Sequence, residues 1–134
     1  MMVGITKLRP ASESEIESLQ MLLEADLDNK VGSVRNGSDF LGETVFVIVH
    51  SGSLAGFCTY RSAADEIFPL VVFHSFRRKG VGKEAMRQLL DILRSEGVEE
   101  VGIEALPGAE SFWQSVFEGF QSRSYGGGKY TFNI

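Results

Sequence analysis

The sequence predicts a mixed α/β (α+β) fold, in which a mostly antiparallel central sheet is flanked by helices. Stretches rich in β-branched and aromatic residues alternate with stretches whose apolar residues recur at helical spacing. Three β-like stretches follow one another with short breaks, as in an antiparallel meander, and a helical stretch then leads to a further strand as a crossover. With 134 residues and no linker or repeat, we expect a single domain over residues 1–134.

The first part of the chain is expected to form a strand, a helix and the meander. Either Ser12 or Ser14 could cap the helix, because acidic residues follow in the first turn, where they favour a helix start. The apolar stripe of this helix is Ile16, Leu19, Leu22 or Leu23, and Leu27, and Asn29 to Glu43 indicates a loop. The strands are expected at Met2–Leu8, Glu43–His50, Leu54–Arg61 and Glu66–Phe73, the last buried on both sides because its apolar run is continuous.

The second part begins with a loop from Arg77 to Gly82 that opens a helix. The stripe of this helix is Val81, Ala85, Leu89 and Ile92 or Leu93, and Gly97 is a plausible C-terminal cap. A strand is predicted from Val98 to Ala105, and a short helix follows Pro107-Gly108. The last residues contain two β-like pieces around three glycines, which indicates a terminal hairpin.

Composition limits the classes of function. The net charge is -5 and the longest basic run is Arg77-Arg78-Lys79, which argues against broad nucleic-acid binding. Cys58 is the only cysteine and no Cys/His cluster exists, so neither a disulfide nor a metal site is predicted. No stretch reaches the ~20 apolar residues of a membrane span, and the N-terminus lacks a signal-peptide run. We therefore expect a cytoplasmic protein without membrane partners, for which a homodimer stays open.

The stretch from Leu70 to Met86 runs from an apolar strand through a short turn into a helix. Gly80 and Gly82 let backbone N–H groups at the helix start approach an anion closely, and the helix dipole adds positive potential. A pyrophosphate suits such a site. The alternative is a tight turn with solvated basic residues. Neither the P-loop pattern nor the full dinucleotide-binding glycine pattern is present.

The spacing Arg77-x-x-Gly80-x-Gly82 resembles the acyl-CoA signature of the GNAT N-acetyltransferase superfamily. Phe76 occupies the aromatic position before the arginine, and Leu70 and Val72 occupy the aliphatic positions of the preceding strand. The segment EALPGAESFWQSVFEGF, residues 104–120, is similar to the strand, helix and Gly-Phe close of that family. The similarity covers roughly Thr44 to Phe120.

This resemblance implies that the chain binds acetyl-CoA (CoA) and acetylates a primary amine by direct transfer in a ternary complex. The acceptor would be a small molecule, a peptide or a protein amine. The backbone of the loop would hold the pyrophosphate, and the strand before it would hold the pantetheine arm and the thioester. The residues so implied are Leu70, Val71, Val72, Arg77, Arg78, Lys79, Gly80, Val81, Gly82 and Lys83.

A general base is needed because an ammonium has no lone pair with which to attack. Glu66 is the predicted base. It lies 11 positions before Arg77 at the start of the apolar strand, and EIFPLVV resembles the strand of the histone-acetyltransferase branch that carries the catalytic glutamate. The alternative is a solvated glutamate at a strand end.

The general acid is not identified by the sequence. Many family members carry a Tyr where this chain has Trp113, which cannot transfer a proton to sulfur. Tyr60, Tyr125 and Tyr130 are unplaced alternatives, and an acid is dispensable if the thiolate leaves by itself. Cys58 is expected to be a small buried residue rather than a nucleophile, and His74 an exposed loop residue.

Two other functions compete with the enzyme. The departure at Trp113 favours a non-catalytic acyl-CoA-binding or regulatory module of the same fold. The third alternative is an interaction domain whose glycine loop is coincidental. Stabilisation by CoA separates the first two from the third, and turnover of amines separates the enzyme from the binding module.

Overall fold

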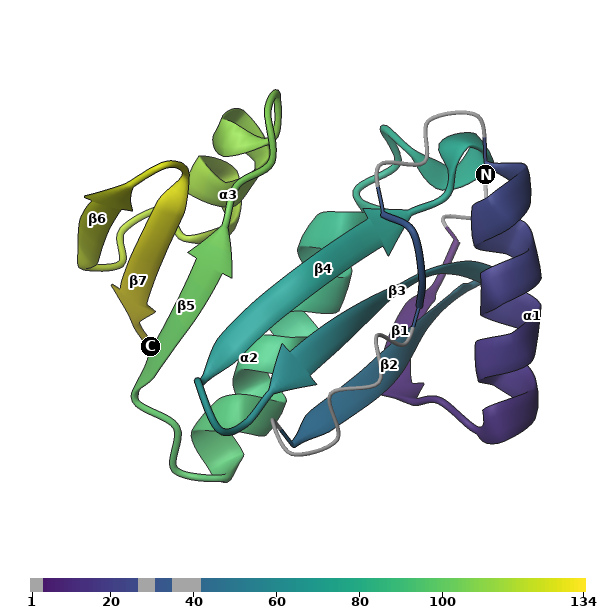
Figure 1. Ribbon diagram of the computed structural model, residues 1–134, viewed down its shortest axis with the longest axis horizontal. Helices are drawn as coiled ribbons and strands as arrows, with labels where there is room; N and C mark the ends of the chain where they lie inside the picture. Colours follow the sequence, from purple (N-terminus) through teal and green to yellow (C-terminus); the bar gives the residue numbers. More distant parts are fainter. Residues whose placement is uncertain (1–3, 27–30, 35–41) are drawn as a thin grey trace.

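The computed structural model describes residues 4–26, 31–34 and 42–134. In this part of the chain, seven strands form one sheet in the order β1-β2-β3-β4-β5-β7-β6 (Figure 1). All neighbouring strands pair antiparallel except β4 and β5, which are parallel. The mixed, mostly antiparallel sheet with flanking helices is the fold class that the sequence predicted. The strands are β1 Thr6–Pro10, β2 Glu43–His50, β3 Ser53–Arg61, β4 Glu66–Val72, β5 Glu100–Glu104, β6 Ser122–Gly126 and β7 Lys129–Asn133.

Helix α1, Glu13–Ala25, covers one face of the sheet. Of the two serines that could cap it, Ser12 does so: its hydroxyl accepts from the backbone N–H of Glu15, whose carboxylate accepts from the backbone N–H of Ser12. Leu19 and Leu23 are fully buried against this face. Leu27 and most of the predicted loop from Asn29 to Glu43 lie outside the described residues.

Helices α2, Val81–Ser95, and α3, Glu110–Val116, cover the opposite face. The predicted stripe of α2 is buried, and the helix ends before Gly97, whose φ of 86° places it in the left-handed region that suits a helix cap. Gln88 fixes α2 against β1, since its side chain accepts from the N–H of Leu8 and donates to the carbonyl of Thr6, each at 2.8 Å. None of the described helices is both long and apolar enough to span a bilayer.

Strands β4 and β5 pair over two residues only. Glu66 pairs with Gly102 and Ile67 with Ile103, and beyond these positions the strands separate, as Figure 1 shows. The expectation that the strand from Glu66 to Phe73 is buried on both sides is therefore wrong. Phe68, Leu70 and Val72 are only partly buried, because β5 does not continue beside them.

Candidate functional site

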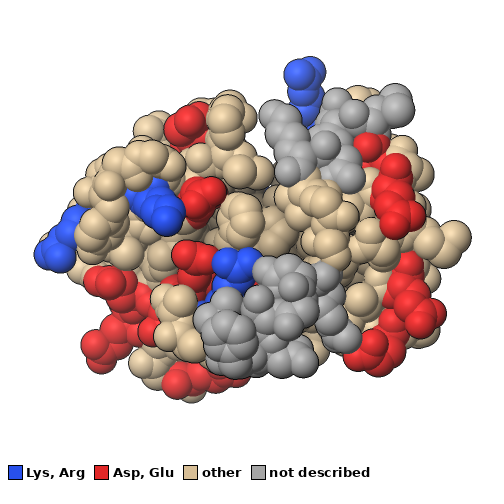
Figure 2. Space-filling view, viewed as in Figure 1, with Lys and Arg blue, Asp and Glu red and all other residues tan. Residues whose placement is uncertain are grey.

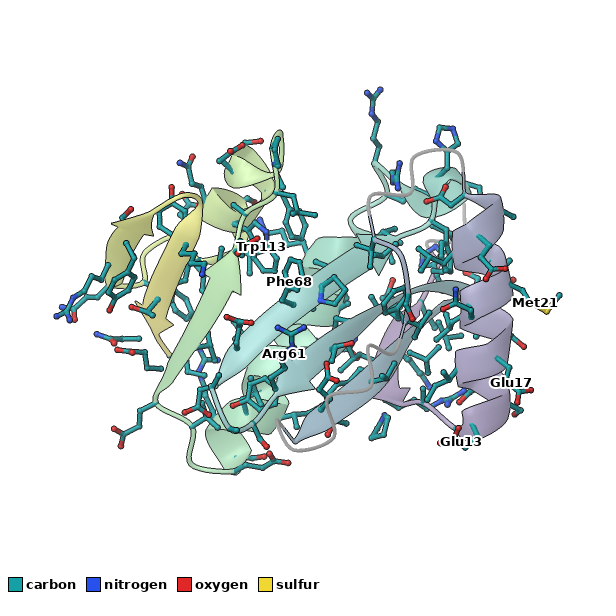
Figure 3. All side chains as sticks on the ribbon, viewed as in Figure 1. Glu13, Glu17, Met21, Arg61, Phe68 and Trp113 are labelled. Carbon is teal, nitrogen blue, oxygen red and sulfur yellow. The ribbon has the colours of Figure 1, made fainter. Side chains whose placement is uncertain are left out.

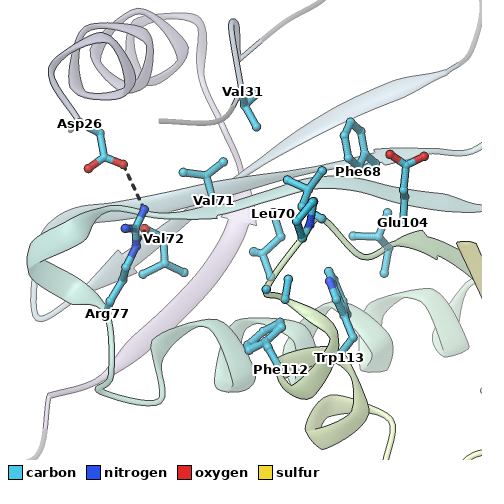
Figure 4. Close-up of a pocket in the computed structure, with 15 residues that line it drawn as sticks. Asp26, Val31, Phe68, Leu70, Val71, Val72, Arg77, Glu104, Phe112 and Trp113 are labelled. Carbon is cyan, nitrogen blue, oxygen red and sulfur yellow. Dashed lines mark hydrogen bonds and ion pairs between the residues drawn. The ribbon is translucent and has the colours of Figure 1, made fainter. Parts of the chain in front are cut away.

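A cavity of about 450 Å³ opens where β4 and β5 separate (Figure 4). In Figure 2 the same face is hollowed between the part formed by β5–β7 and the rest of the sheet, and acidic side chains gather over α1. The cavity lies between the second half of β4, the end of β5 and the start of α3. It is lined by Asp26, Val31, Ile67, Phe68, Leu70, Val71, Val72, Arg77, Glu104, Leu106, Pro107, Gly108, Ala109, Phe112 and Trp113. The predicted strand residues Leu70, Val71 and Val72 thus all face or border one cavity.

A β-bulge in β4 shapes this cavity. Ile67 pairs with Tyr60 and Leu70 with Cys58, so the single residue Thr59 stands opposite both Phe68 and Pro69. The extra residue changes the alternation of the strand, and Ile67 and Leu70 come to face the same side of the sheet. The family resemblance implies a bulge in this strand, but the sequence pattern did not reveal it. The residue that could have indicated the bulge is Pro69, because a proline inside a strand is confined to edges and bulges, where its missing N–H breaks no ladder bond.

The side chain of Arg77 ties the end of β4 to the end of α1. Its Nε donates to the carbonyl oxygen of Val72 at 2.8 Å, and its guanidinium lies 3.2 Å from the carboxylate of Asp26 (Figure 4). The Asp26 side chain is only 3% exposed, so this ion pair is largely shielded from water. Arg77 lines the cavity, and these two contacts hold its guanidinium between Val72 and Asp26.

The start of α2 has the backbone of an anion site. Gly80 caps the helix in the left-handed conformation, with φ of 74° and no side-chain cap bond. The N–H of Glu84 donates to the carbonyl of Gly80, so the N–H groups of the three preceding helical residues come before the first intrahelical bond. Arg78 also has a positive φ of 60° and is exposed, as are Lys79 and Lys83. Backbone donors, helix dipole and basic side chains therefore converge on one loop.

Gly82 brings this loop next to the cavity. It is buried, and a Cβ placed on it would lie 3.1 Å from the ring of Phe112 and 3.3 Å from a methyl group of Val72. Both neighbours line the cavity. The absence of a side chain at Gly82 thus lets the first turn of α2 approach α3 and β4 closely.

The predicted base, Glu66, lies outside the residues that line the cavity. Its carboxylate accepts a hydrogen bond from Arg61 at 3.0 Å, and Arg61 also contacts the carboxylate of Glu43 at 3.3 Å. The guanidinium of Arg61 lies 5.6 Å from the centre of the Phe68 ring (Figure 3), so this charged cluster borders the cavity through Phe68. Glu66 is therefore engaged in an ion pair at the start of β4.

Glu104 is the carboxylate that the sequence reasoning missed. It is the last residue of β5, is half-buried, and lines the cavity beside Phe68 (Figure 4). The other carboxylate of the lining, Asp26, is paired with Arg77. The available signal was the position of Glu104 at the end of a predicted strand, immediately before the chain turns into a short helix.

The aromatic residues of α3 form one wall. Phe112 and Trp113 line the cavity, and Trp113 packs edge-on to Phe112 and stacks on Phe117. None of the three tyrosines is among the described lining residues. Tyr60 is buried and donates to Asp65, and its burial raises the pKa of its hydroxyl. His74 is exposed, and nowhere in the described ranges do three His, Cys, Asp or Glu side chains form a metal site.

Cys58 should not form an acetyl-cysteine intermediate. The residue is fully buried in β3, and burial raises the pKa of its thiol, which leaves it without a reactive thiolate. Intact-protein mass spectrometry after incubation with acetyl-CoA alone should therefore show an unmodified Cys58. A stoichiometric acetyl adduct mapped to Cys58 would rule out direct transfer.

Comparison with known proteins shows which family model and which solved structures the chain resembles. Residues 12–117 match the family model described as the acetyltransferase (GNAT) family. No curated protein shows detectable sequence similarity to the chain. Among solved structures, the chain resembles a GCN5-related N-acetyltransferase from Rhodopseudomonas palustris, with a TM-score of 0.72 at 14% identity over 100% of this chain and 99% of the other.

Two further structures share the fold. One is a GNAT-family acetyltransferase from Brucella melitensis in complex with acetyl-CoA, with a TM-score of 0.68 at 15% identity over 97% of this chain and 88% of the other. The other is the ribosomal-protein-S18-alanine N-acetyltransferase from Escherichia coli, with a TM-score of 0.63 at 16% identity over 96% and 90%. At these identities the matches show a common fold.

Proposed function

The chain belongs to the GNAT acetyltransferase family, and we propose that it transfers the acetyl group of acetyl-CoA directly to a primary amine within a ternary complex. The observation that carries this proposal is the contact of the anion site with the cavity. Through Gly82, the first turn of α2 lies against Val72 and Phe112, which both line the space between β4 and β5. A ligand with a pyrophosphate and a long, narrow arm could occupy both.

The residues present suit CoA. The uncapped helix start at Gly80 suits the pyrophosphate, and the exposed Arg78, Lys79 and Lys83 supply positive charge around it. The apolar residues from Leu70 to Val72 and the ring of Phe112 suit the pantetheine arm. Acetyl-CoA, when bound, supplies an activated acetyl group on a thiol that leaves readily.

We assign proton removal from the amine to Glu104. Glu104 lines the cavity, and no ion pair to a described residue engages its carboxylate. The hypothesis for Glu66 stays as the alternative, in which Glu66 would act through water past Phe68 while bonded to Arg61. A base must lie within hydrogen-bond reach of the proton that it removes, directly or through one water. Position in the cavity therefore favours Glu104.

The acceptor can be a small amine, a peptide or a protein amine, and the alternative function is a non-catalytic acyl-CoA-binding module. That alternative is favoured by one observation, the absence of any tyrosine from the described lining of the cavity. Asp26 at the end of α1 and Val31 beyond it line the cavity and would contact the acceptor.

A turnover screen tests the function. Acetyl-CoA and the protein are mixed with a panel of small amines and peptides, and release of free CoA thiol is followed, alongside thermal unfolding with and without CoA. We expect acceptor-dependent thiol release and a raised unfolding temperature. Stabilisation by CoA without turnover of any amine would favour the binding module, and absence of both would contradict the proposal.

A further inference from the structure

Side-chain hydrogen-bond donors are scarce in the cavity. Among the described residues that line it, only Arg77 and Trp113 carry a side-chain N–H, and none carries a hydroxyl or thiol group. Arg77 is engaged by the carbonyl of Val72 and the carboxylate of Asp26. Apart from Arg77, the indole of Trp113 is therefore the one side-chain donor that the described lining offers to a ligand.

The indole is held rigidly and faces the cavity. Trp113 is only 6% exposed, and its ring lies 5.2 Å from that of Phe112, edge-on, and 6.1 Å from that of Phe117, stacked. In Figure 4 its nitrogen is directed up from α3 into the space below Leu70 and Glu104. No described residue accepts a hydrogen bond from this nitrogen. The N–H of a tryptophan in a protein interior usually finds a hydrogen-bond partner, so an indole N–H that opens into a cavity suits a ligand that brings an acceptor.

We propose that Trp113 donates a hydrogen bond from Nε1 to the sulfur of CoA and stabilises its thiolate without transferring a proton. The inference rests on the proposed function, because it requires the thiol end of CoA to lie in this cavity. An indole nitrogen is a donor only. When the acetyl carbon–sulfur bond breaks, the sulfur leaves as a thiolate that takes a proton from solvent, and when free CoA binds, its thiol loses a proton to solvent. In both cases the indole keeps its own proton, and no covalent bond of Trp113 forms or breaks. Trp113 would thus stabilise the thiolate electrostatically through its fixed N–H dipole, where an acid would transfer a proton.

This role predicts a pH dependence of CoA affinity. A donor that prefers the thiolate lowers the pKa of the bound thiol below its free value of about 8.5. CoA should therefore bind more tightly as pH rises from the pKa of the bound thiol towards that of the free thiol. Hydrogen bonds to charged groups are the stronger ones, so we expect a gain of about 10-fold or more.

The test compares CoA with desulfo-CoA, which lacks the thiol. Calorimetry gives Kd for both at about pH 6.5 and about pH 9.5, on either side of the free thiol pKa. In the wild-type protein the ratio of the CoA Kd to the desulfo-CoA Kd should fall about 10-fold as pH rises, whereas in Trp113→Phe it should stay nearly constant. Phe112→Leu is the matched control, because it alters the same wall without removing an N–H and should keep the pH dependence.

The outcomes separate the two proposals. If CoA and desulfo-CoA both fail to bind, the proposed function is wrong and this inference falls with it. If CoA binds but Trp113→Phe shows the same pH-dependent ratio as the wild type, only the inference is overturned.

A second measurement needs no variant, because Trp113 is the only tryptophan in the chain. At about pH 9.5, above the free thiol pKa, CoA should quench the tryptophan fluorescence of the wild-type protein more strongly than desulfo-CoA does. Equal fluorescence changes with the two ligands would place the sulfur away from the indole and overturn the inference.

Discussion

Replacing Glu104 by Gln should lower acetyl transfer at neutral pH by about 100- to 10,000-fold while CoA affinity stays nearly unchanged. Glutamine keeps the size and polarity of the side chain at the cavity wall but cannot accept a proton from the amine. The loss should shrink as pH rises towards the pKa of the amine, because a neutral amine needs no base to free its lone pair for attack. Steady-state kinetics over pH with the acceptor from the screen, together with calorimetry for CoA, measure both effects.

Glu66→Gln is the matched control for this prediction. It makes the same chemical change at the neighbouring strand β4, on a carboxylate that is bonded to Arg61 and lies outside the described lining. If Glu104 is the base, Glu66→Gln should keep most of the turnover. The reverse pattern, with activity lost in Glu66→Gln and kept in Glu104→Gln, would restore the base predicted from the sequence.

Replacing Gly82 by Glu should abolish the stabilisation of the protein by CoA. In the wild-type protein, CoA at 100 times its Kd should add about 2.7 kcal/mol to the free energy of unfolding. A side chain at Gly82 meets Phe112 and Val72 at once, and its carboxylate adds negative charge where the pyrophosphate is expected. Thermal or denaturant unfolding with and without CoA measures the difference.

Two variants isolate the cause. Gly82→Ala adds bulk without charge and should weaken stabilisation by CoA, because the Phe112 ring must shift to admit the Cβ. Ser122→Glu adds one negative charge on exposed β6 and should respond to CoA as the wild type does. Unfolding without CoA shows how far each change affects the fold itself. Full stabilisation of Gly82→Glu by CoA would exclude this loop as the binding site.

The outcome for β4 shows where prediction from sequence stopped. The apolar run from Glu66 to Phe73 indicated a strand correctly, because hydrophobicity and β-propensity are local properties. The run also suggested burial on both sides, which is wrong, because burial depends on whether a neighbouring strand continues alongside. Here β5 diverges from β4 beyond the pair that it forms with Ile67. Pro69 marked the irregularity but did not say which neighbour would be lost.

The roles of the charged residues depended in the same way on distant partners. Arg77 was identified from its spacing to Gly80 and Gly82, yet its guanidinium meets Asp26, which lies 51 residues away in the sequence. Glu66 was identified from its offset along one strand, whereas its partner Arg61 comes from the neighbouring strand. No local sequence pattern predicts such ion pairs, since they form only when separate elements pack against one another.

The sequence by itself determined the order of strands and helices, the glycine-containing turn before α2 and the relationship to an acetyltransferase family. These depend on periodicity, turn chemistry and motif spacing, all of which are properties of neighbouring residues. Only the tertiary structure decided that β4 carries a bulge and parts from β5, that the cavity so formed holds Glu104 and not Glu66, and that the indole of Trp113 faces into it. The physical reason is that a cavity is bounded by elements far apart in the sequence, and its chemistry follows from which side chains their packing leaves unpaired.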